Sequence, residues 1–206
     1  MIASKAMRFI DEQRFLEEMR SFGLDLSEDR RYLRFRNVDA TMGFDFTNLS
    51  MPGSDDDVFD SLNAREGGVE AIMVRSAVDM MESARLFPIY LFASDNEWLD
   101  EDPAPLLQQG LLTENEAKAL TAIVESGHAM DVIVLEPEEL DIAVDIITPQ
   151  ICALGSTCFA VDIKGRAYTL FSQDDEVSFN TLDKNIYRMA RGYVSGLSKL
   201  PFDIIW

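Results

Sequence analysis

Three side chains have the chemistry for nucleophilic catalysis, but their surroundings argue against that use. They are the only histidine, His128, and the two cysteines, Cys152 and Cys158. A catalytic cysteine needs a thiolate beside a base. Cys158 stands in an apolar strand pattern and Cys152 in an apolar turn, so we interpret both thiols as buried packing residues, with a Cys158–His128 pair as the alternative hypothesis. One histidine and two cysteines do not make a structural zinc site, and no cofactor is predicted.

Carboxylates offer a second kind of chemistry, because the chain has 37 of them. Acids at strand ends can hold a catalytic metal ion, and Asp95, Asp131 and Asp162 flank predicted strands. The alternative function is therefore a small metal-dependent hydrolase with a site built from scattered carboxylates. The run 55–57 of three aspartates lacks the ligand spacing of a calcium-binding loop, and none of the common phosphate-loop, nucleophile-elbow or zinc-protease motifs is present.

The distribution of charge says more than its total of −19. Residues 37–163 carry 25 acidic against 4 basic side chains, whereas the segments on either side are close to neutral. Such a field repels nucleic acid and anionic membranes and favours contact with a basic protein. We therefore predict a basic protein partner, no direct binding of nucleic acid and no membrane contact.

One short segment combines this charge with an aromatic side chain. Five carboxylates surround Trp98, and Pro103 and Pro105 follow, which we expect to keep the segment out of a helix. Tryptophan often anchors protein interfaces, so we predict that the partner binds here. The alternative is that Trp98 folds back onto the core and leaves the acids in water. The predicted partner-binding residues are Asp95, Glu97, Trp98, Asp100, Glu101 and Asp102.

Two basic groups stand out against the acidic background. Arg34 and Arg36 follow Arg30 and Arg31 in a strand pattern, and the range 184–191 has Lys or Arg at i, i+4 and i+7 of a predicted helix. Each is interpreted as a solvated or salt-bridged face, with contact to an anion or an acidic partner as the alternative.

The elements that position these residues follow from hydrophobic periodicity. Helices are predicted over 4–22, 69–86, 113–126, 137–147 and 182–197, and the helix at 113–126 starts with a Thr113-x-x-Glu116 capping box. Strands are predicted over 32–38, 43–46, 89–93, 131–135 and 177–179, with a hairpin of 157–163 and 166–172 around a two-residue Lys164-Gly165 turn. The apolar tail 202–206 is expected to pack onto the domain or a sheet edge.

These elements predict an α+β (or α/β) fold in a single domain, 1–206. We expect a mixed sheet of about five to seven strands with a C-terminal β-hairpin, packed by about five helices. Residues 39–68 are predicted to form a long loop and 94–112 an acidic Trp-containing connection.

The favoured function is a non-enzymatic acidic binding protein, an inhibitor or immunity-type protein that occupies a basic surface of a partner protein and mimics nucleic acid there. With no signal-peptide pattern and with thiols expected to be reduced, we predict a cytoplasmic location. A third interpretation assigns the charge to solubility alone, with function at an interface around Trp98 or Trp206. The sequence does not predict the oligomeric state.

Overall fold

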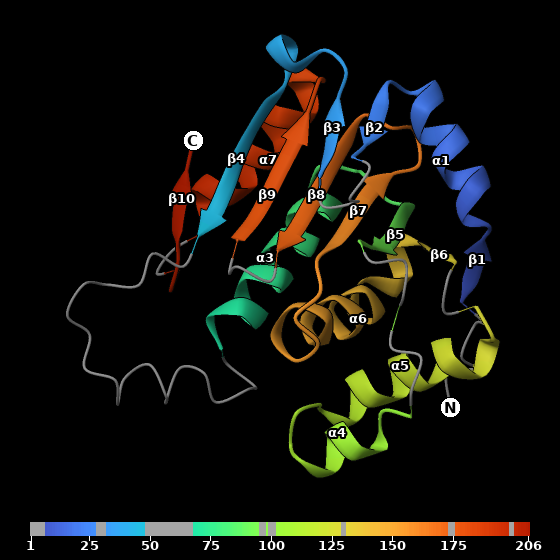
Figure 1. Cartoon of the computed structure of the whole chain (residues 1–206). Helices are drawn as coiled ribbons and strands as arrows, with labels where there is room; N and C mark the ends of the chain where they lie inside the picture. The colour runs from blue at the N-terminus through green and yellow to red at the C-terminus, as the bar shows by residue number, and fades with distance from the viewer. Residues whose placement is uncertain are drawn as a thin grey trace.

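The computed structural model describes residues 7–27, 32–47, 68–94, 98, 102–128, 131–172, 176–197 and 200–206, and its centre is an eight-stranded antiparallel sheet (Figure 1). The strand order is β1-β6-β5-β7-β8-β9-β4-β10. Its strands are β1 (Arg8–Ile10), β4 (Met42–Thr47), β5 (Ile89–Ala93), β6 (Val132–Leu135), β7 (Cys158–Asp162), β8 (Ala167–Ser172), β9 (Glu176–Thr181) and β10 (Asp203–Ile205). A separate antiparallel ribbon consists of β2 (Leu24–Leu26) and β3 (Leu33–Phe35).

Helices cover both faces of the sheet unequally. The described helices are α1 (Glu12–Ser21), α3 (Val69–Ser83), α4 (Ala104–Gln108), α5 (Glu114–Ser126), α6 (Leu140–Cys152) and α7 (Lys184–Gly196), with short 3-10 turns η1 (Val38–Ala40) and η2 (Pro137–Glu139). α3, α6 and α7 lie behind the sheet in Figure 1, α5 packs on α6, and α4 packs on α5. α1 and the β2–β3 ribbon cover part of the opposite face.

The two cores follow from the alternation of side chains along each strand. All five residues of β7 are buried. Cys158 and Ala160 face the helices α3, α6 and α7, whereas Phe159 and Val161 face α1 and the ribbon. A strand buried on both faces reads as a continuous apolar run, and that is the sequence pattern of β5, β6 and β7.

The smaller layer is fixed by aromatic contacts and one hydrogen bond. The ring of Phe15 in α1 lies 4.7 Å from that of Phe92 in β5. The Tyr90 hydroxyl donates to Glu18 at 2.6 Å. Desolvation and this carboxylate raise the pKa of Tyr90 to about 12. The ribbon reaches β8 through Phe35, whose ring lies 5.4 Å from that of Tyr168.

Several predicted elements are confirmed. β5, the hairpin of β7 and β8, and the third strand β9 lie where the pattern places them, and the tail forms β10 on β4. Thr113 and Glu116 exchange both hydrogen bonds of the capping box. The α+β class is therefore correct.

The sheet itself differs from the prediction in two respects. It has eight strands rather than five to seven, and every neighbouring pair is antiparallel, so it is not a mixed sheet. The extra strands are the short edges β1 and β10. β4 occupies part of the predicted loop 39–68 and pairs with β9 and β10 instead of with the strand before it. Residues 48–67 of that loop lie outside the described part.

The predicted first helix, 4–22, is shorter than expected. Residues 1–6 are outside the described range, Arg8–Ile10 form β1, and Asp11 caps α1 by accepting a hydrogen bond from the Arg14 backbone. β1 pairs with β6, a partner far along the sequence that local periodicity does not reveal. Gly23, with a φ of +80°, follows the C-cap residue of α1 and ends this helix as predicted.

The hairpin turn is longer than the predicted two residues. Residues 163–166 connect β7 to β8, and the Gly165 backbone donates to Asp162 O at 2.7 Å. Gly165 has a φ of +63°, and a Cβ there would lie 2.3 Å from that of Phe22, so both backbone and packing require glycine. None of the described helices is long and apolar enough to cross a membrane.

We predict that one buried hydroxyl destabilises the sheet. Thr169 in β8 is fully buried, and within the described structure its hydroxyl has no hydrogen-bond partner. Thr169→Val keeps the branched shape and removes that group, so the free energy of unfolding in urea should rise by about 1 kcal/mol.

Thr181→Val is the matched control. Thr181 is equally buried, but its hydroxyl donates to Arg166 O at 2.7 Å and accepts from the Asp183 backbone at 3.0 Å. This variant should lose about 1–2 kcal/mol. Shifts of the same sign in both variants would contradict the assignment.

Candidate functional site

Trp98 is the centre of the predicted partner-binding segment, and the structure places it in the core. Its side chain is only 2% exposed and packs with the residues beneath α3, α5 and α6. The indole Nε1 donates to Asp131 O at 3.0 Å, which satisfies its one polar atom. Trp98 therefore folds back onto the core, as in the second interpretation of this segment, and its ring is not presented to a partner. Asp95, Glu97, Asp100 and Glu101 lie outside the described residues.

Asp102, the last predicted partner-binding residue, is exposed at the start of α4. Its carboxylate accepts a hydrogen bond from the Ala104 backbone at 2.9 Å. Pro103 and Pro105 stand at the N-cap and in the first turn of α4, a short helix within 94–112 that was not predicted from the sequence. Backbone N–H groups in the first turn have no acceptor within the helix, so the N–H that proline lacks is not missed there and proline favours the start of a helix.

A shallow groove of about 410 Å³ lies between α4 and α5. Its lining includes the apolar residues Leu107 from α4 and Ala117 and Ala122 from α5, and we call it the α4–α5 groove. Asp102, Glu114 and Glu125 stand on its rim, and Lys118, the only basic residue among the described residues of its lining, lies 3.7 Å from Glu114. A second hollow of about 210 Å³ shares Lys118 and Ala122 of α5 with this groove and extends to α6, where it includes Asp145.

Beyond this hollow, carboxylates from three helices form what we call the helical acidic surface. Its members are Asp79 and Glu82 of α3, Glu116 of α5, and Asp141 and Asp145 of α6. Arg75 is the cation among them, 2.8 Å from Asp141 and 3.9 Å from Asp79. These side chains come from separate parts of the sequence, and the packing of α3 on α6 and of α5 on α6 brings them together.

The crowding changes the acidity of two of these groups. Partial burial raises the pKa of Asp79, and the charges of Glu82 and Asp141 raise it further against the opposing effect of Arg75. Burial, Glu116 and Asp141 likewise raise the pKa of Asp145. A raised carboxylate pKa means that ionisation is disfavoured in the folded state. An added cation would relieve this repulsion, so the surface is suited to binding basic groups.

Of the residues proposed for carboxylate chemistry, the two that the structure describes, Asp131 and Asp162, are not brought together. Asp162 is 1% exposed and forms a two-pronged ion pair with Arg166, with N–O distances of 2.6 and 3.0 Å. Asp131 binds His128 Nδ1 at 2.6 Å, and Asp95 lies outside the described range. In the described ranges no three His, Cys, Asp or Glu side chains gather closely enough to hold a metal ion.

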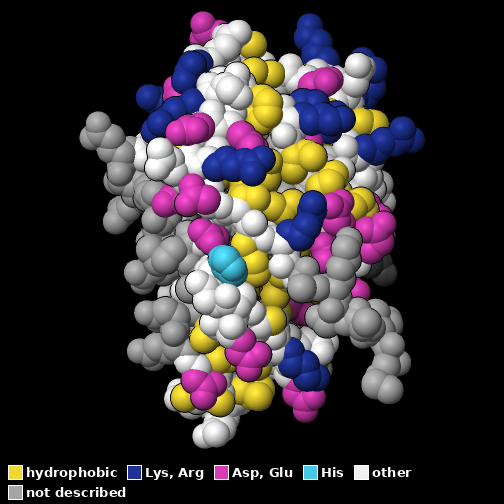
Figure 2. Space-filling model, turned by 90° about the vertical axis from the view of Figure 1, so that its right-hand side faces the viewer, with side chains coloured by type: hydrophobic (Ala, Val, Ile, Leu, Met, Phe, Trp, Pro, Cys, Tyr) yellow, Lys and Arg dark blue, Asp and Glu magenta, His cyan; other side chains and the backbone are white. Residues whose placement is uncertain are grey.

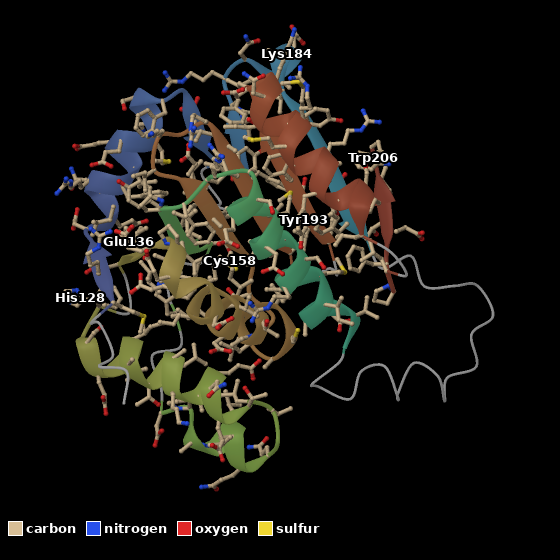
Figure 3. The ribbon with its side chains drawn as sticks, turned by 180° about the vertical axis from the view of Figure 1, so that it is seen from behind. His128, Glu136, Cys158, Lys184, Tyr193 and Trp206 are labelled. Atoms are coloured by element: carbon tan, nitrogen blue, oxygen red, sulfur yellow. The ribbon has the colours of Figure 1, made fainter. Side chains whose placement is uncertain are left out.

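The hypothetical Cys158–His128 pair is not supported. Cys158 is buried at the centre of the sheet, whereas the imidazole of His128 stacks on Phe9 at 4.8 Å near the surface. Figure 3 shows the two residues well apart, and the imidazole is visible on the outer face in Figure 2. Cys152 is exposed rather than buried, because it stands in the last turn of α6 beyond the predicted end of that helix.

The basic strand is explained in part by an ion pair. Arg36 contacts Asp25 of the neighbouring strand through two hydrogen bonds of 2.9 Å. This pairing lowers the pKa of the Asp25 carboxyl. Arg30 and Arg31 lie outside the described residues, so the anion-site hypothesis for this group stays a prediction.

Sequence reasoning missed the helical acidic surface as a site. The acidic middle of the chain was recognisable, and Asp141 and Asp145 have the i, i+4 spacing of one helix face. The approach of α3 and α5 to that face depends on which helices pack together, and neither charge pattern nor periodicity gives that information.

We expect Asp162→Asn to act on stability, because Asp162 is a structural ion-pair partner. Leaving Arg166 without its buried counter-charge should lower the free energy of unfolding by about 2–3 kcal/mol. The exposed Asp25–Arg36 pair provides the comparison, and Asp25→Asn should cost less than about 1 kcal/mol. Equal midpoints of urea unfolding for Asp162→Asn and the unmodified chain would refute the buried pair.

Asp145→Asn should instead stabilise the protein at neutral pH. The raised pKa of Asp145 means that the folded state binds its proton more tightly than the unfolded state, so its ionisation weakens folding as pH rises above about 4. Because the side chain is partly solvated, the gain should be only about 0.5 kcal/mol at pH 7. Thermal or urea unfolding at pH 7 and at pH 3 measures it, and a gain that persists at pH 3 would exclude this cause.

Comparison with known proteins adds no functional information. No protein-family model, no curated protein and no solved structure matches this chain.

Proposed function

We propose that this chain is a non-enzymatic acidic binding protein that occupies a basic surface of a partner protein, in the manner of an inhibitor or immunity-type protein. The observation that carries the proposal is the helical acidic surface, where Asp79 and Asp145 have raised pKa values and Arg75 is the cation in their midst. Folding places these carboxylates side by side at a cost in stability. A chain that needed charge only for solubility could spread them over the surface.

The α4–α5 groove adds apolar contact surface, which a charged surface alone does not provide. Acidic fields speed the encounter with a basic partner and reject anionic competitors, but they give little net affinity. Affinity comes from apolar side chains that fill a depression surrounded by a polar rim. The lining of the groove combines these two kinds of residue, the apolar Leu107 and Ala122 and the acidic Asp102 and Glu125. A basic segment with small apolar residues would fit it.

The partner is a protein whose basic surface is exposed for its own function. Proteins that bind nucleic acid are the largest such class, because they neutralise phosphates with Lys and Arg. Bound to such a surface, the carboxylates would take the place of phosphates and block access to the nucleic acid. On this proposal the chain acts where its partner is found, and the cytoplasm is the proposed location.

The first experiment is capture of proteins on the immobilised chain, followed by binding measurements with the purified partner. We expect one basic protein to be retained at low salt and released at moderate salt, because screening weakens exposed charge pairs beyond about 8 Å at physiological ionic strength. If the partner binds DNA, a DNA duplex should compete with the chain for it.

Charge reversal locates the contact. The double variant Asp102→Lys with Glu125→Lys should slow association with the purified partner by about tenfold, because both residues stand on the rim of the α4–α5 groove. Surface plasmon resonance at two salt concentrations measures the rate.

Glu17→Lys with Asp39→Lys is the control pair. It changes the net charge equally, but Glu17 belongs to α1 and Asp39 to η1, outside the helices α3 to α6. Its association rate should stay close to that of the unmodified chain. If the two double variants slow association equally, only net charge matters and the groove is not the contact.

A further inference from the structure

A basic surface lies at the opposite end of the helical layer from α4 and α5. Lys184, Arg188 and Arg191 are exposed along one face of α7, and α7 contains no carboxylate. Among the described residues, none of these three cations has an ion-pair partner. Arg188 contacts Asn185 at 3.4 Å, and Arg191 lies over the ring of Trp206 at 4.8 Å. In a chain with a net charge of −19, three such cations on one face are unexpected.

This basic face adjoins the last strand of the sheet. In the described structure β10 pairs with β4 on one side only and stands at the outer edge in Figure 1. The other side of an edge strand presents backbone N–H and C=O groups that can pair with a further strand. Short length and charged residues protect an edge, and β10 has both, with three residues and an exposed Asp203 at its start. Its other end is apolar, because Ile205 and the following Trp206 are exposed.

The two exposed apolar side chains lie on opposite faces of this edge. Trp206 is 52% exposed, and its ring lies 5.2 Å from that of Phe44, on the face that α7 covers. Ile205 is 49% exposed and alternates to the other face, opposite Asp45 of β4. A strand added beside β10 would therefore meet an apolar side chain on each face.

The cations of α7 are within reach of such a strand. A neighbouring strand would lie about 4.8 Å beyond β10, and Arg191 already extends to Trp206. Figure 3 shows Trp206 beside α7 and Lys184 at the beginning of the same helix. Carboxylates on the α7 side of an added strand would face these cations, and apolar residues would contact Trp206 or Ile205.

We propose that the edge of β10 and the basic face of α7 together bind an extended acidic segment of a partner protein, which joins the sheet as a further strand. Backbone hydrogen bonds would supply affinity, and alternating acidic and apolar side chains would supply specificity. The site is independent of the proposed function, because it uses neither the α4–α5 groove nor the helical acidic surface.

Charge decides between this occupant and a second copy of the chain. A two-fold pairing of β10 with itself would bring the two α7 helices together and place their cations opposite one another, at a cost in repulsion. An acidic segment neutralises the same cations. The net negative charge of the chain does not prevent this, because at physiological salt charges more than about 8 Å away are largely screened.

The test uses a fluorescent peptide in which glutamate alternates with valine, with anisotropy as the readout at physiological salt. We expect saturable binding to the full chain, and binding weaker by about tenfold or more for Arg188→Glu with Arg191→Glu. Arg20→Glu with Lys164→Glu is the control of equal charge, at exposed positions in α1 and in the β7–β8 turn, and it should bind as the unmodified chain does. Circular dichroism confirms that each variant is folded.

A second peptide separates strand addition from simple ion pairing. The same sequence with alternate backbone nitrogens methylated keeps every carboxylate but cannot donate the ladder hydrogen bonds, so it should bind about tenfold more weakly or worse. Equal binding of the two peptides would contradict the proposal that the segment binds as an added strand.

Three further results would overturn the proposal as a whole. They are failure of the acidic peptide to bind, equal binding of a peptide in which lysine replaces glutamate, and a dimer of the chain in sedimentation velocity that the Arg188→Glu, Arg191→Glu variant dissociates. The last result would identify a second copy as the occupant. The variant Asp102→Lys with Glu125→Lys should bind the peptide normally, which keeps this test separate from that of the α4–α5 groove.

Discussion

The burial of β7 on both faces is the constraint that organises this molecule. Every residue of the strand is inaccessible to solvent, so the sheet must be covered on each side where β7 and its neighbours run. The helices α3, α6 and α7 satisfy one side, and α1 with the β2–β3 ribbon satisfies the other. Because the apolar residues are committed to these two interfaces, charged residues are left for the outer surfaces of the helices, and the unequal charge of the helices becomes an unequal charge of the molecule's surface.

Packing the helices also determines which charges become neighbours. α3 and α5 both pack on α6, and the contact brings carboxylates from three separate sequence segments into one electrostatic unit. Partial burial is the main cause of the raised pKa values of Asp79 and Asp145, and the neighbouring carboxylates add to it. The repulsion among these carboxylates is present in the isolated chain, and a cation placed beside them would reduce it.

The sequence was informative wherever structure depends on local contacts. The capping box at Thr113, the apolar run of β5 and the hairpin of β7 and β8 each depend on residues close together in the chain, and each was predicted. Errors occurred where a distant partner decides. Phe9 and Ile10 fit the apolar stripe of a helix, but they lie in β1, which pairs with β6. β4 pairs with β9 and not with the strand that precedes it in the sequence. Trp98 shows the same limit at the candidate site, because acidic neighbours suggest a surface position while the indole reaches Asp131 across the core. The cations of α7 were recognised as a stripe, but their position beside an open strand edge depends on the tail forming β10.

The strand order has a further consequence for how the chain folds. In the eight-stranded sheet, short turns join the meander of β7, β8 and β9, and the consecutive strands β5 and β6 are separated by α4 and α5. By contrast, β1 pairs with β6 and β4 with β9 across more than half of the chain. Contacts between distant segments require the closure of long loops before they return any stabilisation, and chains rich in such contacts fold slowly. We therefore expect the meander to form early in folding, because its contacts close only short loops. The short edge strands β1 and β10, each paired on one side only in the described structure, are expected to join the sheet later.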